Sequence, residues 1–128
     1  MRVLLDTHVL VWALVTPGRI SPKVAEILKD GRNNLVWSVL GTAELAVKVG
    51  KGSLKLPEPL DAWFADRRAR LNLEILHLRQ EHALRVATLP RHHRDPFDRL
   101  LVAQAQVEDI PLITRDARLR SYEVEVIW

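Results

Sequence analysis

Cysteine is absent from this chain of 128 residues, which excludes disulfide bonds, thiolate metal ligands and a cysteine nucleophile. The same absence is typical of proteins of the reducing cytoplasm, where we expect this one. No apolar run approaches the roughly 20 residues of a transmembrane helix, so we expect no membrane association. Asp6 and His8 interrupt the apolar N-terminal stretch, which therefore predicts folded structure rather than a signal peptide. No GxGxxG motif or P-loop is present, so neither supports nucleotide binding.

Charge and apolar content are those of an ordinary globular domain. Apolar residues make up 48% of the chain and charged residues 27%. The length suits one hydrophobic core, so we expect a single domain over residues 1–128. The net charge of +3 weakly favours a polyanionic partner. Part of this charge lies in two basic clusters, at 67–70 and 91–94, and each is either a solvated surface or a nucleic-acid contact.

Short apolar runs alternate with helical patterns along the whole chain. The runs are continuous rather than alternating with polar residues, which is typical of strands buried on both faces of a parallel sheet. We therefore predict a three-layer α/β/α domain with a mainly parallel sheet of about five strands. The expected strands are 3–5, 35–39, 74–78, 111–114 and 124–128, and the expected helices are 9–14, 22–30, 42–50, 60–71, 79–90 and one that begins at 96.

Acidic residues recur where strands end and helices begin. Asp6 and Asp116 follow expected strands, whereas Glu44 and Asp98 open expected helices. The carboxyl ends of parallel strands share one edge of the sheet, so we expect these acids to converge. A divalent cation such as Mg²⁺ or Mn²⁺ would offset their mutual repulsion. Asp98 is the clearest case, because it falls within the apolar stripe of its helix, where an unpaired carboxylate is costly.

Helix capping is the alternative explanation for each acid taken alone. Asp95 at the N-cap and Asp98 at the third helical position would form a variant of the capping box. Glu44 could project toward a polar face and pair with Lys48 one turn later. Capping does not explain the inward direction of Asp98 or the recurrence of an acid at each junction, so the pattern favours a metal site. A zinc site is disfavoured, because His92 and His93 lack a third ligand at zinc spacing.

Four stretches of the chain, in order, resemble the PIN-domain ribonucleases and are most similar to the VapC toxins of bacterial toxin–antitoxin pairs. They are RVLLDTHVLVWAL, SVLGTAELAVKVGKGSLKLP, HRDPFDRLLVAQA and PLITRDARLRSYEVEVIW. The resemblance implies an endoribonuclease that uses Mg²⁺ or Mn²⁺ and inhibits translation or growth when free of antitoxin. It also implies an RNA substrate, a VapB-type antitoxin partner and a homodimer.

The resemblance assigns roles to particular residues. The catalytic and metal-binding acids would be Asp6, Glu44, Asp98 and Asp116. Thr7, Asp95 and Thr114 would lie next to these acids and orient them without binding the metal. We expect RNA contacts from Lys48, Arg91, His93 and Arg94. Candidate dimer or antitoxin contacts, if they are not core residues, are Trp12, Val47, Trp63 and Phe64. One departure is notable: relatives commonly have a serine and a bulky residue shortly before the second acid. Here Gly41-Thr42-Ala43 stands there, and Thr42 could supply the hydroxyl.

Two other classes of protein share part of this pattern. A phospho-accepting receiver domain needs paired acids after its first strand and a lysine after its last, and the chain has neither. A non-catalytic PIN-like module that binds RNA or protein remains the alternative, although the complete set of four acids argues against it.

Overall fold

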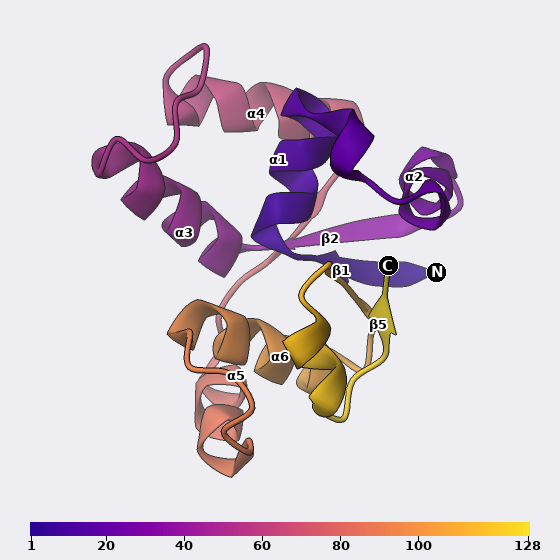
Figure 1. Cartoon of the computed structure of the whole chain (residues 1–128), viewed down its shortest axis with the longest axis vertical. Coiled ribbons are helices and arrows are strands. Elements are labelled where there is room, and N and C mark those ends of the chain that lie inside the picture. Colours follow the sequence, from indigo (N-terminus) through magenta and orange to yellow (C-terminus); the bar gives the residue numbers. More distant parts are fainter.

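The computed structural model describes all 128 residues (Figure 1). Five parallel strands form one sheet in the order β3-β2-β1-β4-β5, which confirms the predicted α/β class and parallel sheet. The strands are β1 (Arg2–Leu5), β2 (Asn34–Ser38), β3 (Glu74–Leu76), β4 (Leu112–Ile113) and β5 (Val126–Ile127). Strands β3, β4 and β5 are shorter than predicted, whereas β1 and β2 each begin one residue earlier than predicted.

Helices cover both faces of the sheet (Figure 1). On one face lie α1 (Thr7–Val15), α2 (Pro22–Lys29), α3 (Val39–Gly50) and α4 (Leu60–Leu71); on the other lie α5 (Gln80–Arg85) and α6 (Pro96–Glu108). Successive strand residues point to opposite faces, so Val3 and Leu5 belong to one core and Leu4 to the other. Trp63 is fully buried in the first core. It is therefore a core residue, the alternative that the sequence analysis had left open, and not a surface contact.

The junction between β2 and α3 differs from the prediction. The helix begins at Val39, three residues earlier than expected, because the Ser38 hydroxyl accepts a hydrogen bond from the Leu40 N–H at 3.1 Å and caps the helix. This start places Glu44 in the second turn, on the buried face with Leu40 and Leu45. The prediction that Glu44 projects toward a polar face was therefore wrong.

Trp37 explains why Gly41 and Thr42 precede the second acid. The indole Nε1 of Trp37 donates a hydrogen bond to the Thr42 hydroxyl at 2.9 Å. A Cβ on Gly41 would lie only 2.6 Å from Cζ2 of the same ring. The hydroxyl of Thr42 is therefore used in packing and is not the site hydroxyl that we expected, and the glycine lets α3 approach β2 closely.

Two further elements are shorter or more irregular than predicted. The expected helix over 79–90 is α5 followed by a 3-10 turn at Val86–Thr88, and a 3-10 helix at Pro17–Arg19 follows α1 where no helix was expected. A third 3-10 helix, η3 (Ala117–Ser121), follows β4. No helix has the length and apolarity that a membrane span requires.

The strand order reverses direction at β1. The chain proceeds from β1 to β2 and β3 on one side, whereas β4 and β5 lie on the other. In open parallel sheets the crevice for a ligand lies at such a switch point, beyond the carboxyl ends of the strands. Asp6 follows β1, and Thr114 and Asp116 follow β4, so the topology brings them to this crevice.

Candidate active site

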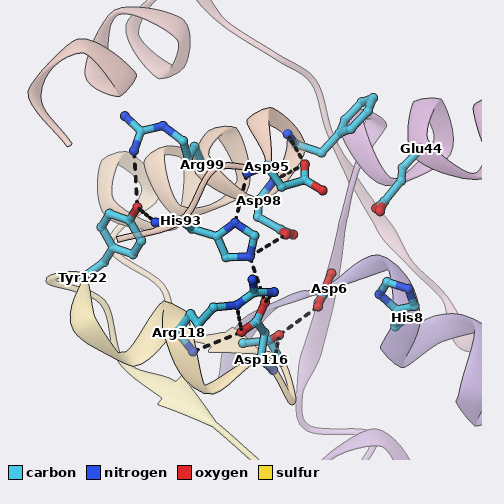
Figure 2. A network of polar contacts seen from close by, with 12 residues as sticks. Asp6, His8, Glu44, His93, Asp95, Asp98, Arg99, Asp116, Arg118 and Tyr122 are labelled. Carbon is cyan, nitrogen blue, oxygen red and sulfur yellow. Dashed lines mark hydrogen bonds and ion pairs between the residues drawn. The ribbon is translucent and has the colours of Figure 1, made fainter. Parts of the chain in front are cut away.

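The four acids predicted from the sequence line one cavity of about 580 Å³ at the carboxyl edge of the sheet. Asp6 follows β1, Glu44 lies in α3, Asp98 in the first turn of α6, and Asp116 caps η3. Figure 2 shows the side chains of Asp6, Asp98 and Asp116 pointing toward one another, with Glu44 directed toward them from across the cavity. Elements far apart in sequence thus present their carboxylates to a common space.

Asp98 has the most perturbed carboxyl group in this cavity. Its pKa is raised to about 7, mainly by burial and then by the negative charges of Asp6, Asp95, Glu44 and Asp116. Without a cation, the cavity therefore favours a protonated Asp98. The inward direction predicted from the helical stripe is observed, since the Asp98 side chain is only 17% exposed.

Asp6 is held by the strand on the other side of the crevice. The Thr114 hydroxyl donates a hydrogen bond to Asp6 Oδ2 at 2.8 Å and accepts one from the Asp116 N–H at 3.1 Å. Burial raises the pKa of Asp6, while the bonds from Thr114 and the Thr7 backbone oppose that rise. Thr114 therefore links two acids through one hydroxyl. Thr7 is buried at the first position of α1 and acts on Asp6 only through its backbone amide.

Asp116 is paired with Arg118, a residue that the sequence analysis missed. The guanidinium donates to Oδ1 at 3.0 Å and to Oδ2 at 2.8 Å, and lowers the pKa of Asp116 to about 2. Asp30 and Arg32 form the same two-residue arrangement on the surface, with contacts at 3.0 and 2.8 Å. Asp-x-Arg is therefore a local turn in which the two side chains pair. This spacing in the sequence could have identified Arg118 as the partner of Asp116.

His93 lies inside the acidic cavity. Its Nε2 is 2.9 Å from Asp116 Oδ2 and 3.2 Å from Asp98 Oδ2, and its side chain is 4% exposed. Ligand atoms of these three residues all lie within 4.8 Å of one another. The sequence analysis placed His93 among exposed RNA contacts. The structure instead directs its ring toward the carboxylates, so an RNA contact by this side chain is no longer expected.

Asp95 caps helix α6. Its Oδ1 accepts hydrogen bonds from the backbone N–H of Phe97 at 2.8 Å and of Asp98 at 3.4 Å. The capping-box variant considered from the sequence is only half formed. The Asp95 N–H donates to His93 Nδ1 at 3.0 Å and not to Asp98, which leaves the Asp98 carboxylate directed into the cavity.

Glu44 and Lys48 form the expected ion pair one helical turn apart. Lys48 Nζ lies 3.3 Å from Glu44 Oε1 and 3.1 Å from His8 Nε2. His8 also lines the cavity and was not singled out from the sequence. Lys48 therefore places a cation at the rim beside the acids.

A second cavity, of about 820 Å³, adjoins the acidic one and shares His93 with it. Arg91, Arg94 and Arg99 line it, and none of the three forms an ion pair with a carboxylate. This region is therefore electropositive beside the acids. In contrast, Arg67 and Arg70 both pair with Asp66 on α4, which favours the solvated-surface explanation for the 67–70 cluster.

The donor set suits a hard divalent cation. The cavity contains carboxylates from four elements, and their repulsion, together with burial, raises the pKa of Asp98 to about 7. Oxygen ligands of this kind are those that Mg²⁺ and Mn²⁺ prefer. Asp6, Glu44, Asp98 and Asp116 would hold such an ion.

Comparisons with known proteins agree with this fold. The chain matches the PIN domain over residues 3–125, and it therefore belongs to the PIN domain family. It is 28% identical over 121 residues to Ribonuclease VapC22 of Mycobacterium tuberculosis, covering 94% of this chain and 91% of that protein. The resemblance to PIN-domain and VapC proteins inferred from the sequence is thus confirmed.

Solved structures share the fold. VapBC2 from Rickettsia felis, bound to a DNA fragment from its promoter, matches with a TM-score of 0.73 and 18% identity, over 99% of this chain and 98% of that one. VapBC-5 from Mycobacterium tuberculosis matches with a TM-score of 0.63 and 21% identity, over 98% and 97% of the two chains. At these identities the likeness establishes the fold.

Proposed function

We propose that this protein is a metal-dependent endoribonuclease that acts as the toxin of a VapBC-type toxin–antitoxin pair. The observation that carries the proposal is the convergence of four carboxylates in one cavity at the switch point of the sheet, next to unpaired arginines. The PIN family match and the similarity to Ribonuclease VapC22 support it. Because RNA is the proposed substrate, we expect the activity in the cytoplasm. There the free toxin would inhibit translation or growth.

The side chains of the cavity suit hydrolysis of an RNA phosphodiester. Asp6, Asp98 and Asp116, with Glu44, would hold the metal ion. Bound Mg²⁺ or Mn²⁺ supplies Lewis-acid polarisation of the phosphoryl group and a water of lowered pKa. Thr114 and Asp95 keep their neighbouring acids oriented, through the hydroxyl contact to Asp6 and the cap of α6.

Cations beside the cavity suit the phosphate backbone of the substrate. Arg91 and Arg94 are exposed and have no acidic partner, and Lys48 lies at the rim near Glu44. Contacts of these side chains with phosphates would position RNA without reading its sequence.

A VapB-type antitoxin is the proposed regulatory partner. The similar structures from Rickettsia felis and Salmonella typhimurium are of VapBC proteins bound to DNA. By analogy, a cognate antitoxin would bind this chain and occlude the acidic cavity.

Helix α3 presents an apolar face that suits a homodimer. The exposed residues recur at helical spacing and are Val39, Ala43, Ala46, Val47 and Gly50. Their small size would let a second copy of the helix approach closely. Of the contact candidates named from the sequence, only Val47 is exposed, whereas Phe64 packs against Trp37 in the core and Trp12 lines the acidic cavity.

Cleavage of labelled total RNA or a tRNA pool by antitoxin-free protein in Mg²⁺ tests the proposed function. We expect fragments that disappear with EDTA and with Asp98→Asn, because both remove the metal site. Equal cleavage by the wild type and Asp98→Asn would contradict the assignment of the site. RNA binding without cleavage, in Mg²⁺ or Mn²⁺, would favour the non-catalytic binding module.

A further inference from the structure

His93 is fixed in position at both its backbone and its ring. Its backbone N–H donates to the Tyr122 hydroxyl at 3.0 Å, and Arg99 Nη1 lies 3.3 Å from the same hydroxyl. Its Nδ1 accepts the Asp95 N–H at 3.0 Å. These contacts hold the backbone of His93 against the end of η3 and its ring against the start of α6 (Figure 2).

The contact with Asp95 determines which ring nitrogen carries the proton. A backbone N–H can only donate, so Nδ1 must present its lone pair. A proton on Nδ1 would face that N–H directly. The proton therefore lies on Nε2, the atom 2.9 Å from Asp116 Oδ2 and 3.2 Å from Asp98 Oδ2. Nε2 is then a donor to Asp116 Oδ2, and the same N–H lies within contact distance of Asp98 Oδ2.

A histidine with this tautomer cannot be a metal ligand through Nε2. Metal-ligating histidines use an unprotonated nitrogen and donate the other ring N–H to a carbonyl, a carboxylate or water. In this chain the other nitrogen faces a donor. The distances alone would allow His93, Asp98 and Asp116 to be a three-ligand group, but the hydrogen-bond directions exclude the nitrogen.

We propose that His93 is a positioning residue, whose Nε2–H joins Asp98 to Asp116 and orients both carboxylates for an all-oxygen metal site. This inference rests on the proposed metal-dependent function. It assigns His93 a role distinct from RNA contact, and it leaves the metal site with oxygen ligands only, the donors that suit Mg²⁺ and Mn²⁺.

The first test reads the tautomer in the metal-free protein. Side-chain ¹⁵N NMR of the wild type should show His93 as the Nε2–H form, while exposed His92 serves as an internal comparison. An Nδ1–H form would overturn the proposal, whether or not the protein cleaves RNA. This measurement needs no variant, so it holds even if substitution of His93 prevents folding.

The second test measures Mn²⁺ binding by titration calorimetry. His93→Ala should weaken binding about 10- to 100-fold, the usual cost of losing such an orienting partner. His93→Gln, whose amide N–H can replace the Nε2–H donor, should recover much of that loss, and His92→Ala should bind like the wild type. Unchanged affinity in His93→Ala would overturn the positioning role alone, whereas a wild type that binds no Mn²⁺ would overturn the proposed function itself.

Pulsed EPR of the Mn²⁺-loaded wild type provides a spectroscopic signature. We expect no directly coordinated nitrogen in the spectrum, because all ligands are oxygens. A coupling from a ligating ¹⁴N that disappears in His93→Ala would show that His93 binds the metal, and would overturn the proposal.

Discussion

Asp98 is the residue at which burial and like charge act together. Its pKa rises to about 7, whereas that of Asp116, only a few ångströms away across His93, falls to about 2 because Arg118 pairs with it. The two acids therefore differ in protonation near neutral pH in the metal-free protein. A cation would bind most tightly when both are ionised, since ligands must be deprotonated.

The raised pKa of Asp98 predicts a pH dependence of stability. Between 3.8 and about 7 the folded chain keeps a proton on Asp98 that the unfolded chain releases. The free energy of unfolding of the metal-free protein should therefore fall as pH rises through this window. Asp116 opposes this trend only below 3.8, and Glu108, whose pKa is also lowered, opposes it only below 4.5.

Urea denaturation in EDTA at several pH values in this window measures that slope. Asp98→Asn should flatten it, with a remainder from Asp6, whose pKa is also raised. A variant with the wild-type slope would show that Asp98 is not the group that retains the proton.

The Thr114 hydroxyl gives a second prediction at this scale. Thr114→Val keeps the shape of the side chain and removes the donor to Asp6. We expect cleavage to fall by about 10-fold or more, as for other residues that orient metal-binding carboxylates, and the free energy of unfolding to fall by about 1 kcal/mol. Thr16→Val, at an exposed threonine whose hydroxyl makes no capping hydrogen bond, is the matched control and should change neither quantity. Wild-type cleavage by Thr114→Val would exclude an orienting role.

Helix α3 sets the position of Glu44 through its contact with β2. The Ser38 cap starts the helix, and Gly41 lets it pack against the Trp37 ring. This packing turns Glu44 to the buried face, where it lines the cavity beside Lys48. The acid that was hardest to place from sequence thus depends on one close approach between a helix and a strand.

Gly41→Ala tests that approach. The added Cβ would lie 2.6 Å from the Trp37 ring, so the helix or the ring must move, and we expect the free energy of unfolding to fall. Overpacking of this kind typically costs about 1–3 kcal/mol. Gly18→Ala, in the 3-10 helix at Pro17–Arg19 with no atom within 4 Å of the new Cβ, is the control and should be neutral or slightly stabilising. Equal stabilities, measured by thermal or urea unfolding, would contradict the predicted clash.

The whole molecule presents its charges and its apolar surface in different places. The acidic cavity and the arginine-lined cavity adjoin at His93, whereas the exposed apolar face of α3 belongs to the other layer of helices (Figure 1). A dimer formed through α3 would therefore leave the arginine-lined cavity free for RNA.

Val47→Lys tests the dimer. We expect the wild type to behave as a dimer in light scattering coupled to size exclusion, and the variant to become monomeric, because a charge would be buried against a second apolar helix. Val15→Lys, at an equally exposed valine on α1, is the control and should stay dimeric. A dimer that persists in Val47→Lys would place the interface elsewhere.

Local patterns in the sequence determined the elements and the acids at their ends. The helix over 60–71 and the start of a helix at Pro22 agree with the structure, because capping and helical periodicity depend on neighbouring residues. The alternation of apolar runs and helices was enough to predict a parallel sheet, and the topology of such a sheet gathers strand ends at one edge. The convergence of Asp6, Asp98 and Asp116 followed from these two facts.

Only the tertiary structure decided what each of these side chains contacts. The direction of Glu44 depended on how closely α3 approaches Trp37, and the pairing of Thr114 with Asp6 joins residues 108 positions apart. Nothing in the sequence placed His93, rather than His92, in the acidic cavity. Its place between two carboxylates depends on a Tyr122 hydroxyl and on the Asp95 N–H, and no local pattern encodes the first of these. A hydrogen bond between distant elements requires a particular distance and direction between its two groups. Only the packing of the whole chain sets that geometry.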